Sequence, residues 1–187
     1  MENERRMMPI GPLMIEHRLI ERMIRQIEVE LVRIDQTEEV DVLFIDQAVD
    51  FIRTYADRCH HGKEEGILFR ELKNKPLTPD QKRVMQELID EHIIGRSTVA
   101  ELVAARNRYA SGDQTALGGI RKALSALVQF YPKHINKEDR EFFIPVMNYF
   151  SEEEKDQMLQ EGIDFDAGLI HEKYQKMVKM RESDMRT

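Results

Sequence analysis

Apolar residues recur along this chain at intervals of three and four, which is the spacing of helices that bury one face. The first such stripe predicts a helix from about Pro12 to Ile34. Its inward positions are Leu13, His17, Ile20, Ile24, Ile27, Leu31 and Ile34. A histidine therefore interrupts an otherwise apolar face.

The same periodicity predicts three further long helices, over about residues 42–73, 78–111 and 114–149. The helix that follows Pro76 has a marked start, because Thr78 can cap its first turn and Gln81 can complete a capping box. Helices joined by short connections pack most simply as an up-down-up-down antiparallel four-helix bundle. The sequence thus predicts an all-α fold.

The length of 187 residues suits one compact domain with a short appendage. We expect the bundle to occupy residues 10–150 and a charged C-terminal helical extension to occupy residues 151–187. Ser151 and Glu154 form a capping box at the start of the extension, and Gly162 predicts a break within it. We expect a solvated side chain for His171.

The formal net charge is −7, and acidic and basic residues are interspersed. This distribution argues against nucleic-acid binding, which needs a basic face. No apolar run is long enough to span a membrane, and the beginning of the sequence does not resemble a signal peptide, so we expect a cytoplasmic protein without a membrane partner. Cys59 is the single cysteine, which excludes an intramolecular disulfide and favours a role as a small buried side chain.

Two His-x-x-x-Glu pairs interrupt apolar stripes, namely His60 with Glu64 and His134 with Glu138. Residues four apart lie on one face of a helix, so each pair could offer two ligands to a metal ion. One such pair alone is more often solvated or hydrogen-bonded than metal-binding. A buried carboxylate, however, costs several kcal/mol unless something positive meets it. A metal cluster would compensate both carboxylates.

Every predicted bundle helix carries at least one histidine in its apolar stripe. The candidate ligands are His17, His60, Glu64, His92, His134 and Glu138. Imidazole suits iron, zinc, copper and nickel, and carboxylates can bridge two cations, so two metals sharing two carboxylates is the economical arrangement. Zinc remains an alternative, although a structural zinc site needs only about four ligands. A metal-free bundle with hydrogen-bonded histidines is the other alternative.

Four segments in this order resemble the hemerythrin-like (HHE) domain over roughly residues 10–150. They are Met14-Ile15-Glu16-His17-Arg18, His60 to Phe69, Asp90-Glu91-His92 and His134 to Asp139. The resemblance implies a four-helix bundle with a non-haem centre of two iron ions, bridged by an oxo or hydroxo group. It further implies that His17 and His60 bind one iron and His92 and His134 the other. Glu64 and Glu138 would bridge the two ions.

One position departs from the oxygen-carrying hemerythrins, whose third helix supplies two histidines four residues apart. Here Arg96 follows His92 at that spacing. The ligand set is similar instead to that of the bacterial di-iron proteins of iron-sulfur-cluster repair. One iron would then lack a protein ligand and could accept dioxygen, nitric oxide or peroxide. We expect Arg96 to form an ion pair, with the alternative that it borders the open metal position and attracts anions.

The sequence leaves open which pair of the second helix faces the metals, because His61 and Glu65 repeat the His-x-x-x-Glu spacing of His60 and Glu64 one position later. Alignment of Leu68 and Phe69 with the family favours His60 and Glu64. The other pair would then support the ligands from outside or face solvent.

The leading functional hypothesis is a di-iron protein that binds or reacts with a small diatomic molecule or peroxide. The rival hypothesis is a non-enzymatic sensor of metal or oxygen that signals to a protein partner through residues 151–187. The sequence does not decide between an enzyme and a sensor.

Overall fold

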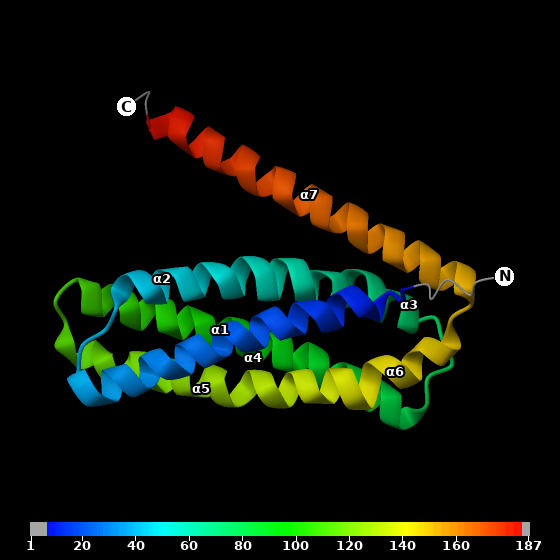
Figure 1. Cartoon of the computed structure of the whole chain (residues 1–187), viewed down its shortest axis with the longest axis horizontal. Helices are drawn as coiled ribbons and strands as arrows, with labels where there is room; N and C mark the ends of the chain where they lie inside the picture. The colour runs from blue at the N-terminus through cyan, green and yellow to red at the C-terminus, as the bar shows by residue number, and fades with distance from the viewer. Residues whose placement is uncertain (1–6, 185–187) are drawn as a thin grey trace.

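The computed structural model describes residues 7–184, and the side chains of residues 7–169, so the side chain of His171 lies outside the described residues. The described part is all-α and contains no strand (Figure 1). The α-helices are α1 (Ile10–Thr37), α2 (Val42–Phe51), α3 (Phe69–Leu72), α4 (Pro79–Ala110), α5 (Leu117–Asn136), α6 (Phe143–Val146) and α7 (Glu152–Asp184). The π-helical segments are η1 (Ile52–His61), η2 (Glu64–Leu68) and η4 (Lys137–Phe142), and the 3-10 turns are η3 (Gln114–Ala116) and η5 (Met147–Tyr149).

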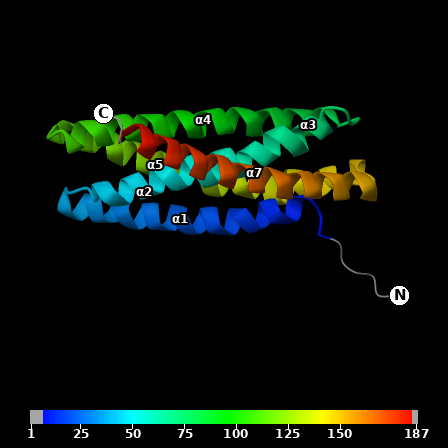
Figure 2. The ribbon, with the colours of Figure 1, turned by 90° about the horizontal axis from the view of Figure 1, so that it is seen from above.

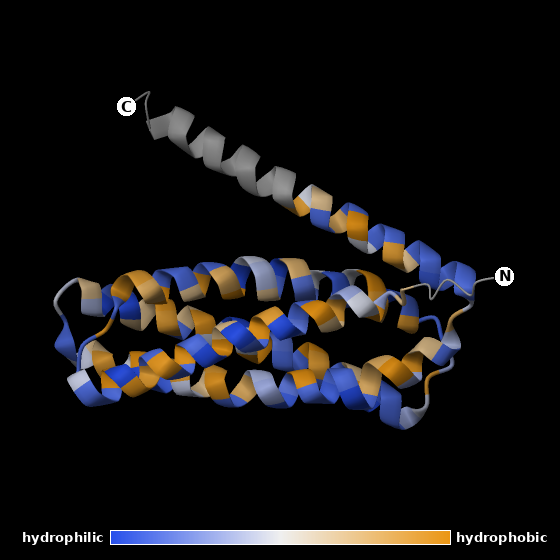
Figure 3. Cartoon of the chain, in the orientation of Figure 1, coloured by the Kyte–Doolittle hydropathy of each residue, from blue (hydrophilic) through white to orange (hydrophobic). Residues whose placement is uncertain are grey.

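These elements form four long rods that lie side by side as an antiparallel bundle (Figures 1 and 2). The rods are α1, then α2 with η1, η2 and α3, then α4, and finally α5 with η4 and α6. Hydrophobic residues are interleaved with hydrophilic ones along each rod, as amphipathic helices require (Figure 3). The predicted all-α bundle is therefore confirmed.

The core consists of two apolar clusters rather than one. The first packs around Ile27, Leu102 and Leu127, and the second around Phe69 and Phe142. On each rod the candidate metal ligands lie where the residues of one cluster give way to those of the other, for example His17 between Leu13 and Ile20. A polar layer thus crosses the bundle between two apolar clusters.

Both predicted capping boxes are confirmed. The backbone N–H of Gln81 donates to the Thr78 hydroxyl at 3.2 Å, and the backbone N–H of Thr78 donates to the Gln81 side chain at 3.0 Å. Ser151 and Glu154 make the same reciprocal pair at the start of α7, at 2.8 and 3.2 Å. Each pair satisfies two donors of a first helical turn.

The predicted break at Gly162 is wrong, because α7 continues through it. A glycine within a helix costs only about 1 kcal/mol relative to alanine, which packing can offset. A Cβ at Gly162 would lie 3.8 Å from the Lys63 side chain. The neighbouring Glu161 accepts two hydrogen bonds from Arg70, at 2.7 and 2.8 Å. The start of α7 is therefore held against the bundle.

In the part of the chain that the structure describes, no helix is both long enough and apolar enough to cross a lipid bilayer.

The Thr78→Ala variant should lower the free energy of unfolding by about 1 kcal/mol, because the first turn of α4 loses its cap. Chemical denaturation followed by circular dichroism measures this change. Thr98→Ala is the matched control on the same helix, since the Thr98 hydroxyl only bonds the carbonyl of Ile94 one turn earlier. The control should change stability by less than about 0.5 kcal/mol. Equal losses in the two variants would contradict the capping role.

Candidate metal centre

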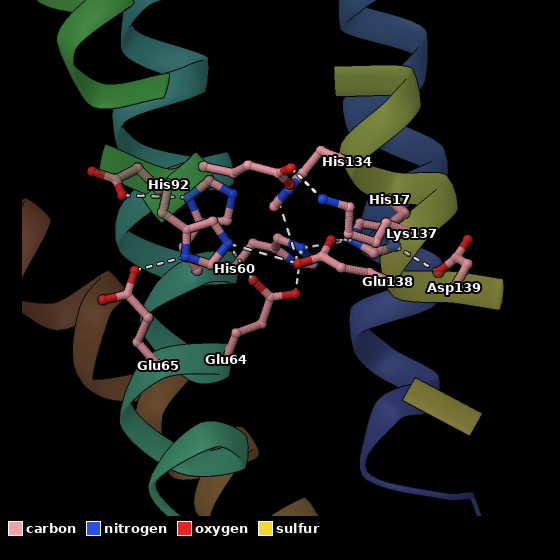
Figure 4. Close-up of polar contacts among 12 residues, drawn as sticks. His17, His60, Glu64, Glu65, His92, His134, Lys137, Glu138 and Asp139 are labelled. Carbon is pink, nitrogen blue, oxygen red and sulfur yellow. Dashed lines mark hydrogen bonds and ion pairs between the residues drawn. The ribbon is translucent and has the colours of Figure 1, made fainter. Parts of the chain in front are cut away.

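Seven polar side chains make up the layer between the two apolar clusters, and we call them the metal layer. They are His17, His60, His61, Glu64, His92, His134 and Glu138. Each is at most 2% exposed. They come from all four rods, and those that Figure 4 labels, all but His61, converge on one point of the bundle. His61 joins them through its ring contacts with His60, His92 and His134.

The metal layer divides into two groups. Ligand atoms of His17, His60, Glu64 and Glu138 lie within 4.8 Å of one another, and so do those of His61, His92 and His134. Such clusters of imidazoles and carboxylates are the donor sets that bind transition metals. Each of the two groups could therefore hold a metal ion.

The two glutamates lie between the groups. Glu64 places one oxygen 3.2 Å from Nε2 of His60 and the other 3.3 Å from Nε2 of His92. Glu138 places one oxygen 3.1 Å from Nε2 of His17 and the other 3.3 Å from Nε2 of His134. Each carboxylate thus faces a histidine of both groups, which is the disposition of a bridging ligand.

Four imidazoles are held from outside by carboxylates, which we call the outer carboxylates. Nδ1 of His17 donates to Asp139 at 2.7 Å, His60 to Glu16 at 2.9 Å, His92 to Glu65 at 2.7 Å and His134 to Glu91 at 2.8 Å. A proton held on Nδ1 leaves the lone pair on Nε2, which points to the middle of the layer. Metal-ligating histidines commonly have such a carboxylate partner.

Cationic side chains in turn hold the outer carboxylates. Arg18 bonds Asp139, Lys63 bonds Glu16, Arg96 bonds Glu65 and Lys137 bonds Glu91. These cations therefore lie outside the layer.

Buried polar atoms in the metal layer lack hydrogen-bond partners. They are both oxygens of Glu64 and of Glu138, Nε2 of His92 and of His134, and both nitrogens of His61. An unsatisfied buried polar group costs about 1–3 kcal/mol, and a charged one costs more. Cations within the layer would satisfy the inward-facing atoms together, so the residues fit a metal centre.

Without a metal, protons must compensate the buried carboxylates. Burial opposes a charge on His17, but Asp139 and Glu138 outweigh it and raise the pKa of His17 to about 10. A similar balance raises the pKa of His92 to about 11. Burial and Glu64 oppose ionisation of Glu138, yet the surrounding imidazoles lower its pKa to about 2. A metal ion would displace the imidazole protons, so its binding should weaken as the pH falls.

Of the two places expected for His61, solvent is excluded, because the side chain is only 2% exposed. Its ring stacks on His92, with centroids 3.9 Å apart and an interplanar angle of 12°. Burial lowers the pKa of His61 to about 4, so the imidazole is neutral. Glu65, in contrast, supports His92 from outside as expected.

The π-helical segments explain why His60 and His61 both face inward. Consecutive side chains of an α-helix point about 100° apart, which would turn one of them away. A π-helix closes i→i+5 hydrogen bonds and so takes more residues per turn. Segment η1 ends at His61, and η2 begins at Glu64. The smaller angle between neighbours brings both imidazoles into the layer.

His61 also bears on the number of candidate ligands near His92 and His134. The third histidine of the second group comes from η1 rather than from α4, where Arg96 occupies the corresponding position. A group of three histidines therefore forms although α4 supplies only one of them, His92. Arg96 forms the predicted interhelical ion pair, 2.7 Å from both Asp57 and Glu65.

Aromatic rings close the layer against water. Phe143 stacks on His17 with centroids 5.8 Å apart, Phe69 on His92 at 6.1 Å, and Phe130 on His134 at 5.1 Å. Their apolar surface lowers the local dielectric and strengthens electrostatic interactions in the layer.

A family model described as the hemerythrin HHE cation binding domain matches residues 8–144. The matched segment contains all seven residues of the metal layer. No curated protein and no solved structure gave a match.

Glu64→Ala should reduce the metal content steeply, because it removes an anionic group that faces both halves of the layer. His61→Ala should also lower the metal content, since the second group keeps only two histidines. Elemental analysis of variants purified in parallel measures both effects. Glu71→Ala is the control on the same rod, where the glutamate pairs with Arg70 at the surface. A full metal complement in His61→Ala would exclude this histidine as a ligand.

Proposed function

Because this chain belongs to the hemerythrin HHE cation-binding domain family, we propose that its metal layer holds two iron ions and that the protein binds or reacts with dioxygen, nitric oxide or peroxide there. The observation that carries the proposal is the placement of Glu64 and Glu138. Each presents its two oxygens to histidines of different groups, and none of these oxygens has a hydrogen-bond partner. Two cations sharing these two carboxylates would give all four oxygens a partner.

We assign His17 and His60 to one iron, and His61, His92 and His134 to the other. Glu64 and Glu138 would hold both ions between them. Iron supplies redox chemistry and coordination positions for small ligands. An ion held by His17 and His60 would have one protein donor fewer than its neighbour, so we expect the small ligand there.

The chain's own residues prepare this site in two ways. The outer carboxylates fix the imidazole orientation and keep the proton on Nδ1. The rings of Phe143, Phe69 and Phe130 pack against the imidazoles and exclude water. Exclusion of water protects a reactive ligand from side reactions.

The donor set supports iron over the structural zinc alternative. A structural zinc ion takes four ligands in tetrahedral geometry, whereas seven candidate ligands are gathered here. Five imidazoles and two carboxylates without a thiolate suit a pair of first-row metals of borderline hardness.

Protein purified without oxygen should contain close to two iron ions per chain. Optical spectra of the reduced protein, exposed in turn to dioxygen, nitric oxide and peroxide, should show which ligand it takes. The charge of the layer requires cations, so the metal-free protein should also be less stable at neutral pH than the loaded one. Persistent absence of iron after reconstitution, with zinc bound instead, would overturn the proposal.

A second candidate function is sensing, and the contacts of α7 favour it. Lys63 is buried and bonds both Glu16, which holds His60, and Asp166 of α7, the latter at 2.8 Å. Phe165 of α7 approaches Gly62 so closely that a Cβ there would lie 2.9 Å from its ring. A change at His60 could therefore alter how α7 packs, and residues 151–187 could pass that change to a protein partner.

Turnover and sensing differ in a measurable way. Steady consumption of peroxide or nitric oxide favours an enzyme, whereas a ligand-dependent change in protease sensitivity of α7 without turnover favours a sensor. In the sensor, Asp166→Asn should remove most of the ligand dependence and leave the iron content unchanged. Asp164→Asn is the control, because Asp164 bonds Gln160 within α7. Protease sensitivity that responds equally in both variants would exclude this route.

A further inference from the structure

A cavity of about 50 Å³ lies between α1, η2 and α7. Buried apolar side chains form its wall on the bundle side, namely Ile10, Leu13, Ile67 and Leu68. The opposite wall belongs to α7 and includes Leu159, Gly162 and Ile163. The cavity therefore lies under the beginning of α7, which meets the bundle beside α3 (Figure 1).

The cavity lies about one helical turn from the metal layer. Leu13 precedes His17 by four residues on α1, so the two side chains share a face of that helix. Leu68 follows Glu64 by four residues in η2. His17 and Glu64 belong to the group that also contains His60. One turn of helix is about 5.4 Å long, so the cavity adjoins the group at which we expect the small ligand.

The two charged residues at the edge of the cavity are compensated by each other and by a third group. Lys63 and Asp166 bond each other at 2.8 Å, and Lys63 also bonds Glu16. The remaining lining consists of aliphatic residues, methionine, proline and glycine. An apolar space of this kind stays dry and takes up apolar molecules such as xenon, because a water molecule needs about two to four polar partners.

The size of the cavity suits a diatomic molecule. One water molecule needs about 10–15 Å³ of such space. The 50 Å³ found here therefore holds dioxygen, nitric oxide or a xenon atom. Hydrogen peroxide is also small enough, but it would lose its hydrogen bonds with water, which is unfavourable in apolar surroundings. The cavity thus favours the two apolar molecules over peroxide.

Contacts on both sides of Gly162 hold α7 over the cavity. Glu161 accepts two hydrogen bonds from Arg70, and Asp166 bonds Lys63. α7 begins at residue 152, beyond the segment 8–144 that matches the family model. The outer wall is thus supplied by a part of the chain that the family model does not include.

We propose that this cavity takes up a small uncharged apolar molecule, dioxygen or nitric oxide, and holds it next to the group of His17 and His60. Ile163 is 55% exposed and marks the outer end of the cavity, between α7 and the bundle. This inference rests on the proposed function and narrows it, because it selects these two ligands against peroxide.

Xenon tests occupancy of the cavity independently of what the metal layer holds. Xenon added under pressure to the full-length protein as purified should shift the methyl NMR signals of Leu13 and Ile67. In Gly162→Leu these shifts should disappear, because the leucine side chain fills the cavity. In the matched control Gly168→Leu they should persist, since a Cβ at Gly168 has no atom within 4 Å and both changes raise helix propensity equally. Methyl signals that do not respond to xenon in the unsubstituted protein would overturn the proposal.

Stopped-flow mixing of the reduced, iron-loaded protein with nitric oxide tests whether the cavity serves the metals. Gly162→Leu should lower the association rate constant at least about fivefold, which corresponds to ~1 kcal/mol in the barrier. The rate constant for peroxide should not change, and Gly168→Leu should change neither. Equal slowing of nitric oxide and peroxide would contradict selection by the cavity. An unchanged rate for nitric oxide in a variant that no longer binds xenon would contradict the holding role.

A second variant acts in the opposite direction, which keeps the test decisive if Gly162→Leu folds poorly. Leu159→Ala widens the cavity, so it should strengthen the response to xenon. Leu169→Ala is the control on the same helix, because Leu169 lies outside the cavity lining. Equal responses in Leu159→Ala and Leu169→Ala would count against the cavity. Iron analysis of the same samples separates the two proposals, since absence of iron contradicts the proposed function and absence of xenon binding contradicts the cavity alone.

Discussion

The burial of two carboxylates at the centre of a helical bundle is the constraint on which this structure depends. Glu64 and Glu138 are fully buried, and their oxygens have no hydrogen-bond partner. Apolar packing cannot compensate such charges, and the cost of leaving them unmatched is several kcal/mol each. The surrounding imidazoles can match them as protonated groups or as ligands of a shared cation. The metal layer is consequently the part of the bundle whose stability depends most on what it binds.

The rest of the bundle holds the metal layer in place from both sides. Apolar clusters on both sides hold the four rods, and their close packing limits movement of the ligand-bearing segments. The π-helical stretches occur in the rods that carry Glu64 and Glu138. Packing above and below therefore supports backbone that departs from regular helix at the place where ligands must converge.

Much of this arrangement is readable from the sequence, because it rests on periodicity. The stripe through His17 and the capping box at Thr78 predict helices that the structure confirms. The position of His61 is not predictable in this way, because it depends on a π-helical segment. No residue type in the sequence marks where such a segment forms. The adjacent pair His60-His61 is the available signal, but in a regular α-helix only one of the two side chains can face inward. The predicted break at Gly162 is wrong for a similar reason, because the low helix propensity of glycine is offset by tertiary packing. Gly162 lies close to the Lys63 side chain.

Moving outward from the metal layer, imidazoles are followed by carboxylates and then by cations. This order limits which distant parts of the molecule the centre can influence. The outer carboxylates each meet a cation, namely Arg18, Lys63, Arg96 or Lys137. Within the described side chains, Lys63 is the buried one of these cations, and it alone continues to α7, through Asp166. The other three end on the four rods. A change in charge at His60 would therefore reach α7 through Glu16 and Lys63, whereas changes at the other imidazoles would be absorbed within the bundle.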